Sequence, residues 1–319
     1  MSLVLEHLTK HFGPVTALDG VSFTVEPGRI FGLLGANGAG KTTAMRIVLD
    51  ILRADHGTVT WQGRPNTELP RRTWGYLPEE RGLYLRMRVI DVLRFFASLY
   101  GVSEADADAR VDEWLDRFRI PEHRERKVEE LSKGNQQKIQ FIAAILHDPD
   151  VLIMDEPFTG LDPVNVQLLK EAFLAMRDRG KTLIFSTHQM EQVEELCESI
   201  AIIDRGRVVV GGSVRDVKRD MGRRVVRLAT ADGGDQDWVQ SLDGVRIGRR
   251  GEDYLELTVP AGSDPQLVLR TALERGEQVT RFEIADPSLE EVFIAHVGRR
   301  ADAEEAHLAP ESSGTGATS

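Results

Sequence analysis

A glycine-rich loop between a short apolar strand and an amphipathic helix is the feature that most restricts how this chain can fold. Ile30–Leu34 is an apolar run typical of a buried strand, and Thr42–Leu52 has helical spacing. In that context glycines allow backbone N–H groups to curl around phosphate oxygens, and the helix N-terminus adds partial positive charge. The pattern therefore predicts a phosphate-binding loop. Its residues are Gly35, Ala36, Asn37, Gly38, Ala39, Gly40, Lys41 and Thr42.

The end of this loop carries the side chains that a nucleotide and its metal ion need. Lys41 is placed to reach the β- and γ-phosphates, and the Thr42 hydroxyl is placed to ligate Mg²⁺, with Thr43 beside it in the binding set. The alternative is a glycine-rich turn that ends in Lys-Thr by chance. The strand before the loop and the helix after it favour the phosphate site, so we expect ATP and Mg²⁺ as cofactors.

Two acidic residues close another apolar run. Asp155 and Glu156 follow Val151–Met154, so one carboxylate is expected near the metal and the next near the attacking water. Phosphoryl transfer needs charge neutralisation and a positioned nucleophile more than covalent help from the protein. Asp155 fits as the Mg²⁺ partner and Glu156 as the general base. An acidic strand end alone is more often a helix cap or a solvated turn, but together with the loop it indicates ATP hydrolysis.

The rest of the chain predicts one large α/β domain, a small α+β domain and a tail. Residues 1–212 alternate strands and helices, which indicates a parallel sheet covered on both faces. Residues 213–299 mix strands and helices in a smaller unit, and residues 300–319 are too polar to order. The expected strands are 3–8, 21–25, 30–34, 151–154, 183–185, 200–203, 225–229, 254–259 and 279–284, and the expected helices are 42–52, 90–100, 111–118, 132–146, 265–275 and 288–297.

Composition excludes several classes of protein. The net charge of -11 argues against a nucleic-acid binder, which would need a basic surface. No uncharged run approaches the ~20 apolar residues of a membrane helix, and Met1–Glu6 lacks the pattern of a signal peptide. The single cysteine, Cys197, fits a reducing cytosol and is interpreted as a small buried residue. A membrane partner stays compatible with all of this.

Over residues 1 to about 212 the chain resembles the ABC ATPase family. Leu131-Ser132-Lys133-Gly134-Asn135 is similar to the family signature, and Gly160-Leu161-Asp162 is similar to its D-loop. His188 resembles the switch histidine that contacts the γ-phosphate, and Phe12 resembles the aromatic residue that stacks on adenine. The order of these motifs along the chain carries the resemblance. Without it, His188 would be a strand-end histidine, Phe12 a core residue and Ser132 a plain helix cap.

The resemblance implies ATP sites that are each completed by a second subunit. In the family the signature loop of one subunit closes over the nucleotide of the other, so Ser132 and Gly134 would contact a γ-phosphate across a head-to-tail dimer. Because one phosphate loop is present, the partner would be a second copy or a paralogue. The resemblance also implies an integral membrane permease as partner, and a peripheral position at the cytoplasmic face of the cell membrane.

Two motifs depart from the common family pattern. Glu79 stands where most members have glutamine, and the signature carries Lys133 and Asn135 in place of glycine and glutamine. Both departures resemble an exporter subgroup that includes sodium-extrusion and drug-efflux ATPases, and Pro287–Phe293 is similar to the end of their accessory domain. We expect Glu79 to contribute to catalysis and to face the metal, with Arg81 partly neutralising it. The alternative is a solvent-facing Glu79 without a role.

Other functions fit less well. A soluble ABC protein acting on ribosomes or DNA generally has two cassettes or coiled-coil insertions, which this chain lacks. A nucleotide sensor without turnover would not need Glu156. The transported substrate, the identity of the permease, the choice between homodimer and heterodimer and the role of the accessory domain are not readable from the sequence, since the permease selects the substrate.

Overall fold

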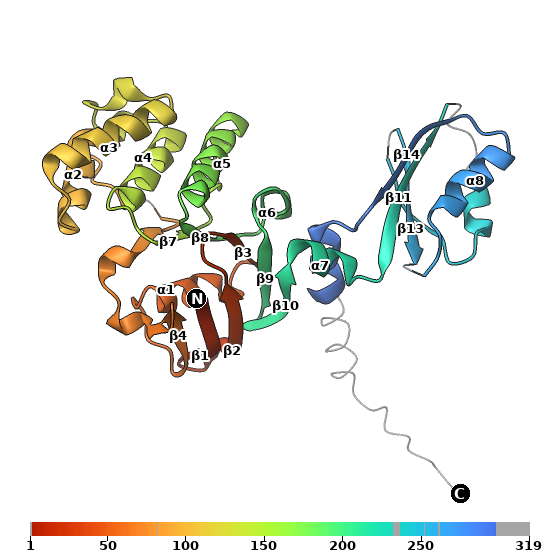
Figure 1. Ribbon diagram of the computed structural model, residues 1–319, viewed down its shortest axis with the longest axis horizontal. Helices are drawn as coiled ribbons and strands as arrows, with labels where there is room; N and C mark the ends of the chain where they lie inside the picture. Colours follow the sequence, from red (N-terminus) through yellow and green to blue (C-terminus); the bar gives the residue numbers. More distant parts are fainter. Residues whose placement is uncertain (1, 81, 232–236, 252, 261, 298–319) are drawn as a thin grey trace, which may run out of the picture. The chain divides into compact units, whose positions relative to one another are not determined.

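The computed structural model describes residues 2–80, 82–231, 237–251, 253–260 and 262–297. The chain divides into two compact units between Ser213 and Val214, which is one residue from the boundary predicted at 212. The first unit contains two sheets and the second contains one, each unit has its own core, and most elements of both are labelled in Figure 1. The predicted tail, residues 300–319, lies outside the described residues.

A six-stranded sheet forms the centre of the first unit. Its strand order is β10-β9-β3-β8-β7-β6, and all neighbours are parallel except β10 and β9. Every residue of β3, β7 and β8 is buried, which explains their continuous apolar runs. The strands are β3 Ile30–Leu34, β6 Trp74–Leu77, β7 Val151–Asp155, β8 Thr182–Thr187, β9 Ser199–Asp204 and β10 Arg207–Ser213.

A second, antiparallel sheet has the order β2-β1-β4-β5. The two predicted strands near the N-terminus are longer than expected and pair with each other from Leu3↔Val25 to Phe12↔Val15. Side chains of both sheets and of helix α1 share one apolar core, which contains Leu5, Leu33 and Met45. The strands are β1 Leu3–Phe12, β2 Val15–Val25, β4 His56–Trp61 and β5 Arg64–Pro65.

Helix α1, Lys41–Val48, ends four residues before the predicted end at Leu52. The backbone turns out of the helix at Asp50, which has φ +53°, and the buried amide of Asn66 supports this end: its Nδ2 donates to the carbonyl oxygens of Ile47 and Val48 at 2.8 and 3.1 Å. A side chain that binds these carbonyl oxygens meets the hydrogen-bonding need of the helix C-terminus. Asn66 comes from a different segment, so the spacing within the helix could not reveal this end.

Between β6 and β7 the chain is largely helical, as predicted. Helix α3 begins at Glu104, seven residues before the predicted start at Val111, because Ser103 caps it by accepting the N–H of Asp106. Its first turns carry alanine and acidic residues, so apolar spacing reveals only the second half. Ser132 caps α4 by accepting the N–H of Asn135, as predicted. The helices are α2 Val89–Leu99, α3 Glu104–Arg117 and α4 Lys133–Ile145, followed after β7 by α5 Pro163–Asp178 and, after β8, by α6 Met190–Leu196.

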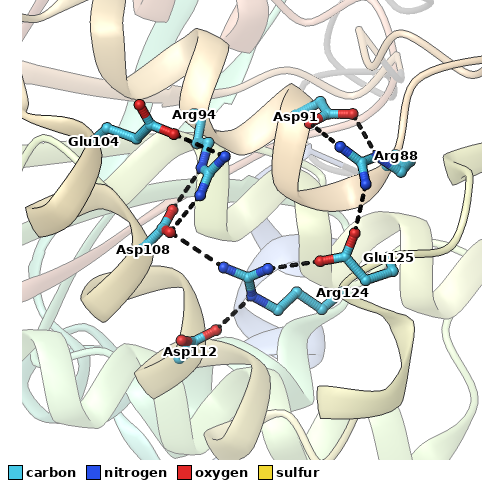
Figure 2. A network of polar contacts seen from close by, with 8 residues as sticks. All are labelled: Arg88, Asp91, Arg94, Glu104, Asp108, Asp112, Arg124 and Glu125. Carbon is cyan, nitrogen blue, oxygen red and sulfur yellow. Dashed lines mark hydrogen bonds and ion pairs between the residues drawn. The ribbon is translucent and has the colours of Figure 1, made fainter.

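A network of ion pairs ties α2, α3 and the segment after α3 together (Figure 2). At its centre Arg94 binds Asp108 through Nε and Nη2, and this contact keeps the pKa of Asp108 below its ordinary value. Arg124 also binds Asp108, at 3.3 Å, so one carboxylate joins two basic side chains. Because the groups lie close to solvent, the network orients these helices more than it adds stability. The other members are Arg88, Asp91, Glu104, Asp112 and Glu125.

The second unit is a small α+β fold. Its antiparallel sheet has the order β12-β13-β11-β14 and packs one face on a core that contains Val226, Leu257 and Val268. Residues 289–297 are helical, and Ser288 and Glu291 cap that helix reciprocally. No described helix in either unit is long and apolar enough to cross a membrane. The elements are α7 Val214–Arg219, β11 Arg223–Thr230, β12 Arg246–Arg250, β13 Leu255–Pro260, α8 Gln266–Glu274 and β14 Val279–Ala285.

Candidate functional site

The glycine-rich loop connects β3 to α1 in a conformation that only glycine can adopt at two positions. Gly35 has φ +155°, and a Cβ there would lie 2.3 Å from the carbonyl oxygen of Ile203. Gly40 has φ +114°, and its Cβ would lie 2.6 Å from the carbonyl oxygen of Ala17. The loop therefore lies tightly against β2 and β9. This packing holds its remaining backbone as a preformed curl before the first turn of α1.

Lys41 lies inside this curl. Its side chain is only 6% exposed, and Nζ donates to the carbonyl oxygens of Gly35 at 2.8 Å and Ala36 at 3.2 Å. The same ammonium group lies 3.8 Å from Oε1 of Glu156. A buried cation held by two carbonyl oxygens and one carboxylate is suited to receive the negative charge of phosphates.

Asp155, at the end of β7, brings together oxygen atoms suited to a magnesium ion. Its Oδ2 accepts the Thr42 hydroxyl at 2.7 Å, and its Oδ1 accepts the Ser186 hydroxyl at 2.5 Å. Mg²⁺ prefers oxygen ligands and is commonly held by one or two protein groups together with phosphates and water. The donor set of Thr42 and Asp155 fits that preference. Ser186 was not predicted, although a hydroxyl at the carboxyl end of the neighbouring strand was a usable signal.

Glu156 is held in an unusual backbone conformation beside Lys41. Its φ is +48°, and its N–H donates to both the carbonyl oxygen and the hydroxyl of Ser186. One carboxylate oxygen accepts the Thr159 hydroxyl at 3.3 Å, and His188 Nδ1 lies 3.1 Å from the same oxygen. The carboxylate is 7% exposed, whereas the His188 side chain is 51% exposed. The structure thus places His188 against Glu156, with its ring open to solvent.

Lys41, Thr42, Asp155 and Glu156 line one cavity of about 340 Å³, whereas His188 contacts Glu156 without lining it. Glu79 reaches it from the loop after β6, so it lies with the phosphate loop and the acidic pair as predicted from the family pattern. Behind Glu79, burial raises the pKa of Tyr76, and the charges of Asp155 and Glu79 add to that rise. Arg81 lies outside the described residues. The lining residues are Val15, Thr16, Ala17, Asn37, Gly38, Gly40, Lys41, Thr42, Thr43, Glu79, Asp155 and Glu156.

Phe12 lies beside the cavity without lining it. Its side chain is 49% exposed, and its strand partner across the β1–β2 turn is Val15, a lining residue. Lys10 Nζ lies 5.6 Å from the centre of its ring. Such exposure rules out the interpretation of Phe12 as a core residue and leaves its ring free to stack on a base.

Ser132 and Gly134 do not reach the cavity of their own chain. They form the N-terminus of α4, where Gly134 packs so closely on Asn165 of α5 that a Cβ would lie 2.6 Å from its amide nitrogen. Asn165 is held by Asp162, whose carboxylate accepts its N–H at 3.0 Å and caps α5. The signature and the D-loop are therefore one structural feature, separate from the phosphate loop.

Comparisons with known proteins agree with this geometry. Residues 18–159 match the family model described as ABC transporter, and residues 212–297 match the C-terminal domain of DrrA1-3-like ATP-binding proteins. The chain is 44% identical to the uncharacterized ABC transporter ATP-binding protein YhaQ of Bacillus subtilis, over 93% of this chain and 98% of the relative. It is 30% identical to the linearmycin resistance ATP-binding protein LnrL of Bacillus subtilis, over 93% and 98%.

A third relative and a solved structure extend these likenesses. The chain is 35% identical to the Nod factor export ATP-binding protein I of Mesorhizobium japonicum, over 92% of this chain and 85% of the relative. A solved structure of the ATP-binding subunit of an ABC transporter superposes with a TM-score of 0.65 at 32% identity, covering 70% of this chain and 94% of that one.

Proposed function

The chain belongs to the ABC transporter family of ATP-binding proteins, and we propose that it powers export through a separate membrane permease as one half of an ATP-sandwich dimer. It is an ATPase with a P-loop fold and a DrrA-like C-terminal domain. The observation that carries the proposal is the convergence of Lys41, Thr42, Asp155 and Glu156 on one cavity, while the signature lies elsewhere on the same unit.

The phosphate loop binds and neutralises the triphosphate. The backbone curl and the α1 N-terminus supply N–H groups, and Lys41 exchanges its contacts with loop carbonyl oxygens for phosphate oxygens. Thr42 and Asp155 would hold Mg²⁺, which would neutralise charge on the phosphates. Phe12 stacks on the adenine from the end of β1.

Glu156 acts as the general base. Its carboxylate takes a proton from the attacking water, and the buried Lys41 ammonium group lies 3.8 Å from it. His188 orients Glu156 through the contact between Nδ1 and the carboxylate, and its exposed ring is able to turn to the γ-phosphate. Glu79 lines the same cavity, and its carboxylate would contribute a further oxygen to the metal.

A second subunit completes each site. Ser132 and Gly134 at the α4 N-terminus close over the γ-phosphate held by the partner, which requires a head-to-tail dimer of this chain with a copy or a paralogue. Among the relatives, one is named for linearmycin resistance and one for Nod factor export, which supports an outward direction of transport. The chain then sits peripherally at the cytoplasmic face of the membrane, bound to its permease.

Sedimentation of Glu156→Gln tests the sandwich, since an amide cannot accept the proton and ATP should persist. We expect dimers with Mg-ATP and monomers with Mg-ADP. Adding Ser132→Arg should abolish the dimer while ATP binding to the monomer stays. A monomer at saturating Mg-ATP would contradict the proposal. Membrane fractionation with and without a co-expressed permease tests the peripheral attachment.

A further inference from the structure

Helix α4 touches the loop that carries Glu79 through one buried side chain, Gln140. This amide is 5% exposed, and Nε2 donates to the carbonyl oxygens of Pro78 and Glu80, both at 3.1 Å. The two acceptors flank Glu79, so both N–H groups of one amide hold the loop on either side of it. The other end of the amide, Oε1, is buried without a partner among the described residues.

Burying the unpaired acceptor Oε1 is unfavourable. The two hydrogen bonds that Nε2 donates are therefore the reason for a glutamine at this position. Leucine or methionine would fill the same space without burying a polar atom. Gln140 does not line the ATP cavity, so it has no direct task at the nucleotide. The glutamine therefore serves the attachment between helix and loop.

The same helix is packed firmly against β6, the strand that leads into this loop. A Cβ at Gly75 would lie 2.5 Å from the carbonyl oxygen of Ala144, so strand and helix touch through their backbones. Just beyond the helix, His147 Nε2 lies 3.0 Å from the carbonyl oxygen of Trp74. These contacts make β6 and the second half of α4 one body, to which Gln140 adds the Glu79 loop.

The opposite end of α4 presents Ser132 and Gly134. Eight residues separate Gln140 from Ser132, which corresponds to about 12 Å along a helix. Gln140 and the signature thus lie on one continuous helix of 13 residues, a rigid element through which a displacement of the Glu79 loop would reach the signature. Asn135 extends the connection, because its Nδ2 lies 3.0 Å from Nε2 of His123, the residue that precedes Arg124 of the ion-pair network.

We propose that Gln140 is a positioning residue that couples the Glu79 loop in one chain's ATP cavity to the signature which that chain presents to its partner's ATP. This rests on the proposed sandwich dimer. The state of Mg-ATP at one cavity then sets the orientation of Ser132 and Gly134 at the other. The link works in both directions, since closure on the partner would also pull on Glu79.

The coupling between the Glu79 loop and the signature is tested by adding Gln140→Leu to the Glu156→Gln chain. The measured quantity is the dimer affinity in the presence of Mg-ATP. We expect dimerisation at least tenfold weaker and ATP affinity of the monomer changed less than twofold. Asn66→Leu is the matched control, because Asn66 also gives one buried amide to two carbonyl oxygens but lies away from the Glu79 loop. That control should leave dimer affinity unchanged.

The variant Glu79→Ala distinguishes coupling through Glu79 from a general loss of packing around Gln140. If Gln140 acts through Glu79, the double variant Glu79→Ala/Gln140→Leu should dimerise about as weakly as the weaker single variant. The proposal would be overturned if the double variant lost dimer affinity by the product of the two single-variant factors. It would also be overturned if Gln140→Leu dimerised as well as its parent. Failure of the Glu156→Gln parent itself to dimerise would instead remove the sandwich, and the link with it.

Hydrogen exchange of the unaltered chain gives a measurement that does not depend on how Gln140 variants fold. Below the concentration at which dimers form, Mg-ATP should slow exchange of the amides of residues 133–135, although these residues do not touch the bound nucleotide. Mg-ADP should slow them less. Exchange at these amides that ignores the nucleotide would contradict the proposal.

Discussion

At the scale of single residues, Glu156 has a left-handed backbone conformation, with φ +48°, that is unfavourable for a residue with a side chain. A non-glycine residue with positive φ costs about 1–3 kcal/mol, and asparagine tolerates this region better than most residues. Glu156→Asn and Glu156→Gln both lose the carboxylate, so neither should turn over ATP. We expect the asparagine variant to melt about 1–3 °C above the glutamine variant. Equal melting temperatures in the absence of nucleotide would mean that the backbone relaxes at no cost.

The exposed ring of Phe12 makes a second prediction at this scale. Phe12→Ala should weaken ATP binding by about 1–3 kcal/mol, the usual value of an aromatic–base stack. Because half of the side chain is already exposed, the melting temperature without nucleotide should hardly change. GTP affinity should fall equally, since stacking reads the face of a base and not its edge. Titration with both nucleotides, next to a melting curve, checks this.

Among the site residues, those with a distinctive position in a motif were predictable, and those of a common type were not. Lys41, Thr42, Asp155 and Glu156 meet in one cavity, as the strand-to-helix loop and the acidic strand end indicate. Ser186 and Thr159 support the acidic pair through hydroxyl groups that any strand end or turn can carry. Gln140 escaped notice because its partners are backbone oxygens more than fifty residues away in the chain.

At the scale of elements, the contact between α4 and β6 has a pH-dependent part. His147 is stacked on Tyr100 and buried, and burial lowers its pKa below the ordinary value of 6.5. Below pH 6.5 the unfolded chain binds a proton that the folded chain resists, so stability falls as the pH falls. We expect melting temperatures to drop more steeply between pH 6.5 and 5 in the wild type than in His147→Gln. The slopes of melting temperature against pH are compared, because loss of the His147–Tyr100 stack lowers the melting temperature at every pH.

Elements were predictable where burial leaves continuous apolar runs, and less so elsewhere. β3, β7, β8 and β9 are buried on both faces and stand out in the sequence. β4 and β12 are largely exposed and rich in polar residues or arginine, and their strand form depends on pairing with distant neighbours. β6 is short, and it is recognised as a strand only through its pairing with β7.

At the scale of the whole molecule, the ATP cavity belongs to one unit. All of its lining residues precede Ser213, where β10 completes the central sheet. We predict that a chain ending at Ser213 folds and binds Mg-ATP with the affinity of the full chain. Circular dichroism and equilibrium titration check this. A truncated chain that folds yet binds ATP tenfold more weakly would show that the second unit contributes to the nucleotide site.

The separation of the signature from the phosphate loop has a genetic consequence. Lys41→Ala spoils the cavity of its own chain, whereas Ser132→Arg spoils only what that chain offers to its neighbour. Two alleles that are each inactive should therefore complement each other when they are expressed together, because a mixed pair contains one intact cavity facing one intact signature. If cells that express both alleles showed no transport activity, both ATP sites of a dimer would have to be intact for function. By the same argument each mutant allele should be recessive to a wild-type copy, because a mixed pair of mutant and wild-type chains also keeps one intact cavity facing one intact signature.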